Sequence, residues 1–153
     1  MNKFGKIDFS KIHGLESLSL EANRGNINYN TLKTLKSLRI GSYKNSSGDI
    51  SDLFCSKKLD TLSIIGSNVY SLEGVDNSSN LQYIELASNR NLCDISALKK
   101  VKSTLKTLGL HHNSNIKDYS IIGELDNLEK LEIRGIKSIS SLNFIKNMRS
   151  LKS

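Results

Sequence analysis

The chain has 153 residues, which is the size of one domain, and 37% of them are hydrophobic. No run approaches the roughly 18 consecutive apolar residues of a membrane span, so no spanning helix is expected. The formal net charge of +7 attracts anionic partners in general, such as nucleic acid, acidic proteins and membrane surfaces, and selects none of them.

One pattern returns six times along the chain: two leucine-like residues three positions apart, then a third two positions further on. The runs begin at Leu15, Leu35, Leu59, Leu81, Leu105 and Leu128, and Leu151 opens a seventh. Successive starts lie 20, 24, 22, 24, 23 and 23 residues apart. A repeat of this length is typical of a solenoid, in which each repeat forms one coil.

Each coil is numbered here from the first leucine of its run. Strand side chains alternate with period two, so positions four and six should point into the core while positions three, five and seven face out. After several strands, apolar residues recur at spacing three, as in Val69, Leu72 and Val75. That spacing is typical of a 3₁₀ or short helical return segment with one apolar edge.

The ends of the chain differ from the coils between them. Ile12 precedes Leu15 by three residues, as Leu125 precedes Leu128, so residues 1–14 are expected to form an incomplete coil that serves as a lid. We expect a single domain over 1–153, with six coils from about 15 to 150 and an unfinished seventh at 151. The first residues contain no apolar segment of a secretion signal, so a cytoplasmic protein is expected.

Position nine carries asparagine in three coils, at Asn23, Asn89 and Asn113. The backbone turns sharply there, and an Asn amide can both donate to and accept from the buried peptide groups that lack strand partners. Stacked amides of this kind would form a ladder. The ladder is expected to be interrupted in three other coils, at Tyr43, Ser67 and Ile136.

The pattern LxxLxLxxN followed by I/VxxLxxI/V, with a period near 22 residues, resembles the leucine-rich-repeat family and particularly its short internalin-like class. The resemblance implies an α/β fold, a right-handed solenoid with a parallel β-sheet on its concave face and 3₁₀ or short helical turns on its convex side. It also implies a general role in binding other proteins.

The sequence contains no arrangement typical of catalysis, metal binding or cofactor binding. His111 and His112 are adjacent on a predicted strand and point to opposite sides, while His13 lies four coils away, so they do not complete a zinc site. The serines occupy regular strand positions, and no GxSxG, P-loop or GxGxxG occurs. We therefore expect neither an enzyme nor a cofactor.

Cys55 and Cys93 fall in the second and fourth coils. Two coil steps of about 4.8 Å separate them by roughly 9.6 Å. A disulfide tolerates a Cα separation of only about 7 Å. Both cysteines are therefore expected to be free thiols, buried or half-buried.

Lysines cluster before several strands, at Lys33, Lys36, Lys57, Lys58, Lys99, Lys100, Lys102 and Lys106. In stacked coils they would lie near one edge, which is either a solvated edge that keeps the protein soluble or an anion-binding stripe. Proteins that bind single-stranded nucleic acid use aromatic side chains for stacking, and only 6% of these residues are aromatic. Anion or nucleic-acid binding along this lysine edge is the alternative function.

Positions three, five and seven carry small polar residues in the first two coils and larger residues in the last four. The larger residues are Ile65, Tyr83, Glu85, His111, Glu132 and Arg134. Tyr and Arg are enriched among the residues that dominate binding energy at protein interfaces. The sequence therefore predicts a non-catalytic module that binds another protein through this patch. One specific version is an inhibitor or immunity-type protein that blocks an acidic partner.

Overall fold

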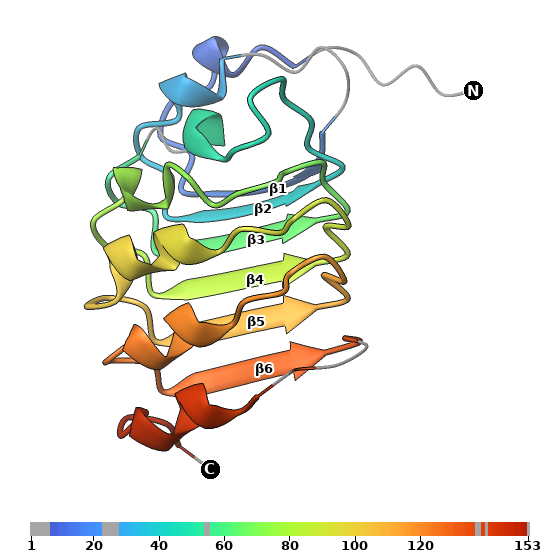
Figure 1. Cartoon of the computed structure of the whole chain (residues 1–153). Coiled ribbons are helices and arrows are strands. Elements are labelled where there is room, and N and C mark those ends of the chain that lie inside the picture. Colours follow the sequence, from blue (N-terminus) through green and yellow to red (C-terminus); the bar gives the residue numbers. More distant parts are fainter. Residues whose placement is uncertain (1–6, 23–27, 54–55, 137–138, 140, 153) are drawn as a thin grey trace.

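The computed structural model describes residues 7–22, 28–53, 56–136, 139 and 141–152. The predictions made for Asn23 and Cys55 lie outside these residues. Six strands form one parallel sheet in the order of the sequence (Figure 1). They are β1 (Ser17–Glu21), β2 (Ser37–Gly41), β3 (Thr61–Ile65), β4 (Tyr83–Ala87), β5 (Thr107–His111) and β6 (Lys130–Arg134). The predicted parallel sheet is confirmed.

Every strand covers positions three to seven of its run, and equal positions pair across the whole sheet. A backbone hydrogen bond between neighbouring coils also repeats at position two of each run. For example, the N–H of Lys36 donates to the carbonyl of Glu16 at 2.8 Å. The N–H of Lys152 makes the same bond to Glu129 at 2.9 Å, so the start of the seventh run pairs like the start of a coil.

The return segments contain short 3₁₀ helices, which lie on the other side of the core from the sheet (Figure 1). They are η1 (Phe9–Lys11), η2 (Tyr29–Thr31), η3 (Ser51–Leu53), η4 (Val75–Asn77), η5 (Ser96–Val101), η6 (Ser120–Glu124) and η7 (Asn143–Asn147). Asp94 precedes η5, and its carboxylate accepts the Ser96 N–H at 2.8 Å. Hydrogen bonds from Ser96 lower the pKa of Asp94. The same Asp-x-Ser turn precedes η1, η3 and η6.

The leucines at position four point into the core as predicted. Leu38, Leu62 and Leu108 are buried, and Leu131 is half-buried. In the last coil, Leu142 and Ile145 are 58% and 38% exposed, contrary to the expectation that residues at spacing three face inward. None of the described coils packs over them. No helix in the described ranges is long and apolar enough to cross a membrane.

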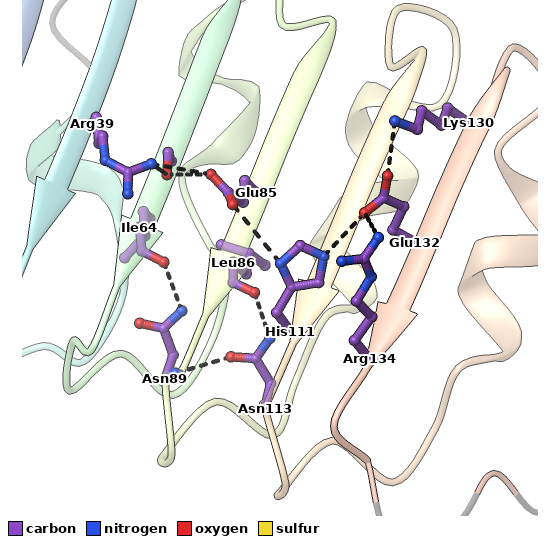
Figure 2. Close-up of polar contacts among 11 residues, drawn as sticks. Arg39, Ile64, Glu85, Leu86, Asn89, His111, Asn113, Lys130, Glu132 and Arg134 are labelled. Atoms are coloured by element: carbon purple, nitrogen blue, oxygen red, sulfur yellow. Dashed lines mark hydrogen bonds and ion pairs between the residues drawn. The ribbon is translucent and has the colours of Figure 1, made fainter.

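Asn89 and Asn113 form the predicted ladder and are both buried (Figure 2). Their side-chain amides donate to the carbonyls of Ile64 at 2.9 Å and Leu86 at 2.7 Å. The Asn113 side-chain oxygen accepts the backbone N–H of Asn89 at 2.9 Å. Each asparagine therefore pairs peptide groups that would otherwise be buried without partners.

Ser67 interrupts the run of asparagines, and its turn is satisfied differently, through a hydroxyl group. The Ser67 N–H donates to the Asn89 side-chain oxygen at 2.9 Å, and the Ser67 hydroxyl accepts the Tyr43 N–H at 3.0 Å. A hydroxyl oxygen is therefore sufficient to continue the chain of bonds by one coil. The ladder ends at Tyr43, where a buried aromatic ring occupies position nine, and burial raises the pKa of its hydroxyl.

Cys93 is a free thiol, but it is exposed rather than buried or half-buried as predicted. It lies on a return segment, where its N–H donates to the Tyr70 carbonyl at 3.1 Å and its side chain remains outside the core. The distance between coils does not determine which way the Cys93 side chain points.

We expect Cys93 to react with Ellman's reagent in the folded protein, because its thiol is open to solvent. Denatured, non-reduced protein should titrate two thiols, and a Cys93→Ser variant should lose the one that reacts in the folded state. Monomeric protein without any titratable thiol would instead indicate a disulfide.

Candidate functional site

The concave face is the side of the sheet formed by positions three, five and seven. The six predicted site residues occupy these positions in β3 to β6, namely Ile65, Tyr83, Glu85, His111, Glu132 and Arg134. Strand register places the position-five residues in one row across the sheet, Ser19, Arg39, Ser63, Glu85, Gly109 and Glu132. Residues far apart in the sequence therefore become neighbours.

The second to fourth residues of this row, Arg39, Ser63 and Glu85, form a hydrogen-bonded group of three side chains (Figure 2). One oxygen of Glu85 accepts the Ser63 hydroxyl at 2.8 Å and lies 3.3 Å from Nη1 of Arg39. The same Arg39 nitrogen is 3.3 Å from the Ser63 oxygen. Ser63, which the sequence places on the outward side, is therefore buried within this group and is not a free surface hydroxyl.

His111 lies in the space that Gly109 leaves open. A Cβ added at Gly109 would be 3.5 Å from both Cε1 and Nε2 of the imidazole. The ring sits between two carboxylates, with Nδ1 3.8 Å from Glu85 and Nε2 3.5 Å from Glu132 (Figure 2). These separations exceed ordinary hydrogen-bond lengths, and Nε2 is buried without a hydrogen-bond partner among the described residues. His111 therefore separates Glu85 from Glu132.

Glu132 is held by two cations of its own strand. Its Oε1 lies 2.8 Å from the Lys130 ammonium, and its Oε2 lies 3.1 Å from Nη2 of Arg134. The hydrogen bond from Lys130, with the charges of Lys130 and Arg134, lowers the pKa of Glu132. The carboxylate is therefore kept ionised and fixed between the two side chains.

The cations and carboxylates of this network differ in exposure. The side chains of Arg39, Lys130 and Arg134 are 54%, 63% and 69% exposed, whereas those of Glu85 and Glu132 are 22% and 27% exposed. Negative charge is thus half-buried and already paired, and positive charge faces solvent. The outward cations are therefore the groups of this network that a partner would meet first.

Tyr83 and Ile65 belong to the same face but not to the polar network. Tyr83 is an exposed aromatic residue at the start of β4, and Ile65 is half-buried at the end of β3. Partial burial, together with the Glu85 carboxylate, raises the pKa of the Tyr83 hydroxyl. These two residues supply the apolar surface beside the charges.

No family model and no curated protein matches the sequence. Among solved structures, the functional domain of InlJ from Listeria monocytogenes, which includes a cysteine ladder, is similar over 97% of this chain, with a TM-score of 0.61 and 18% identity. The chain has an internalin-like leucine-rich-repeat fold. It spans 31% of the length of that InlJ chain. Identity this low shows the fold alone.

A second match is an internalin, InlF, from Listeria monocytogenes strain 4b F2365. It has 17% identity and a TM-score of 0.37, and the match covers 95% of this chain and 55% of that one. The low TM-score adds nothing to the assignment.

Three residues of the polar network on the concave face were missing from the predicted patch, namely Arg39, Ser63 and Lys130. A signal for each of them was present. Aligning the coils at position five puts Arg39 two coils from Glu85, with the small residue Ser63 between them. Lys130 occupies position three of its run and therefore lies on the same face of β6 as Glu132.

Several lysines of the predicted edge are paired with acidic residues. Lys36 lies 2.9 Å from Glu16, Lys99 lies 3.3 Å from Glu124, Lys102 lies 3.7 Å from Asp126, and Lys100 contacts both Glu73 and Asp76. The positive charge of the lysine edge is therefore partly neutralised. In the part of the chain that the structure describes, no group of three His, Cys, Asp or Glu side chains is arranged to hold a metal ion.

Proposed function

We propose that this leucine-rich-repeat protein is a non-catalytic module that binds another protein through the concave face of β3 to β6. The observation that carries the proposal is the network from Arg39 to Arg134, which fixes charged side chains on a sheet beside Tyr83 and Ile65. A surface whose side chains are already held in place loses less conformational entropy on binding than a mobile one.

This protein would block a surface of its partner sterically, as an inhibitor or an immunity-type protein does. The net charge of +7 favours an acidic partner. We further propose that the protein is cytoplasmic. The exposed free thiol of Cys93 fits a reducing compartment, in which disulfides rarely persist.

We expect Tyr83→Ala or Arg134→Ala to weaken partner binding about thirtyfold, because truncating an aromatic or Arg anchor typically costs about 2 kcal/mol. A pull-down followed by mass spectrometry would identify the partner, and titration calorimetry would then give the affinities. Tyr70→Ala is the matched control, because it removes an exposed tyrosine from a return segment instead of the concave face.

Unchanged unfolding midpoints would show that the variants remain folded. If Tyr83→Ala and Arg134→Ala bind as tightly as the parent chain, the concave face is not the site.

The lysine edge is tested separately by reversing Lys99, Lys100 and Lys102 to Glu. Exposed charges outside a contact surface alter the association rate more than the dissociation rate, so we expect this triple variant to associate more slowly with an acidic partner. Heparin or RNA should not compete with a bound protein. If the triple reversal abolishes binding while Tyr83→Ala and Arg134→Ala have no effect, anion binding along this edge replaces the proposed function.

A further inference from the structure

The cations of the concave face retain unused hydrogen-bond donors that face solvent. A guanidinium has five N–H donors, and the contacts of Arg39 and Arg134 to described residues involve only Nη1 and Nη2, respectively. Both side chains are more than half exposed, as is Lys130. We call Arg39 the β2 cationic site, and Lys130 with Arg134 the β6 cationic site.

The carboxylates of this face in β3 to β6 are mostly occupied, whereas Glu21 at the end of β1 is exposed. Both oxygens of Glu132 face Lys130 or Arg134, and one oxygen of Glu85 accepts from Ser63 and Arg39. The remaining Glu85 oxygen faces the ring of His111. Over β3 to β6, a partner that offers donors therefore finds few open carboxylate oxygens, whereas a partner that offers acceptors meets outward N–H groups at both cationic sites.

The two cationic sites are separated by a neutral or negative stretch. They lie four strand steps apart, roughly 19 Å at about 4.8 Å per step. Glu85, Gly109 and His111 lie between them. A nucleic-acid strand carries phosphates in close succession, so it would have to place some of them over Glu85. Tyr83 is the one aromatic residue at an outward position of the described strands, so base stacking has little support.

We propose that the concave face recognises carboxylate groups on an acidic protein surface at these two sites, Arg39 at one end and Lys130 with Arg134 at the other. The inference rests on the proposed function, because it assumes that the concave face is the contact surface. Two carboxylate clusters would match the sites if they were separated by about 14 residues of an α-helix, which is close to four turns and about 21 Å at 1.5 Å per residue and keeps both clusters on one side of the helix.

The probe is a helical, alanine-rich peptide with a pair of Glu residues at each end, about 14 residues apart, so that both pairs lie on one side of the helix. Its counterpart carries Gln in place of Glu. Fluorescence anisotropy at low salt should detect binding of the Glu peptide and much weaker binding of the Gln peptide. Arg39→Gln and Arg134→Gln should each weaken binding of the Glu peptide about threefold to fivefold. The double variant should weaken it about tenfold or more, because distant sites act independently.

Lys117→Gln is the control, because it removes the same charge from an exposed residue outside the sheet and should change affinity less than twofold. Equal binding of the Glu and Gln peptides would overturn the inference. So would an equal effect of Lys117→Gln and Arg39→Gln. An oligothymidylate that binds more tightly than the Glu peptide, and depends on Arg39, would show phosphate recognition instead.

The two proposals fail in different ways. If the natural partner is sensitive to Tyr83→Ala but not to Arg39→Gln or Arg134→Gln, the concave face is the site and the carboxylate inference is wrong. Binding of the Glu peptide could instead depend on Arg39 and Arg134 while the affinity for the natural partner is unchanged by Tyr83→Ala and by both arginine variants. In that case the proposed function is wrong, although the peptide-binding site exists.

Discussion

Leu108→Ala should lower the free energy of unfolding by about 2–5 kcal/mol, because it leaves a cavity in a well-packed core. Leu108 is buried at position four of β5, between the equivalent residues Ile84 and Leu131 of the neighbouring strands. The cavity would thus open in the middle of the stack. Urea unfolding monitored by circular dichroism gives the measurement.

Leu142→Ala is the matched control for this change. Leu142 is 58% exposed, so its truncation should cost less than about 0.5 kcal/mol. A loss below about 1 kcal/mol for Leu108→Ala, or similar losses for the two variants, would mean that the strand register is wrong.

Asn89→Ala should destabilise the protein by at least about 2 kcal/mol, because it leaves two buried peptide groups unpaired at about 1–3 kcal/mol each. These are the carbonyl of Ile64 and the N–H of Ser67, which now bond to the Asn89 side chain at 2.9 Å each. Asn89→Ser should recover part of the loss, because Ser67 already accepts a backbone N–H in the preceding coil. Thermal and urea unfolding provide the test.

Asn115→Ala separates burial from the loss of a hydrogen bond. Its side-chain amide also donates to a backbone carbonyl, that of Arg90 at 2.7 Å, but this bond is exposed. Water can replace the missing donor there, so the expected loss is below about 1 kcal/mol. Equal losses for Asn89→Ala and Asn115→Ala would contradict a structural role for the buried ladder.

The leucine pattern by itself predicted six repeated strands, each followed by a 3₁₀ or short helical return segment, and the resemblance to the leucine-rich-repeat family implied that the strands are parallel. A repeat length near 22 residues and period-two alternation are local properties, and stacking copies of one unit leaves little freedom in how they pair. The same alternation placed all six predicted patch residues on the concave face. Asn89 and Asn113 were predictable too, because a buried turn needs a side chain that both donates and accepts.

The tertiary structure alone decided how side chains use the space between coils. Arg39 reaches Glu85 two coils away. His111 lies over Gly109 of its own strand and between the carboxylates of Glu85 and Glu132, which belong to the two neighbouring coils. Ser67 continues the ladder only because Asn89 lies within hydrogen-bond distance of it in the next coil. Sequence periodicity specifies the face on which a side chain begins, whereas its end point depends on contacts between coils.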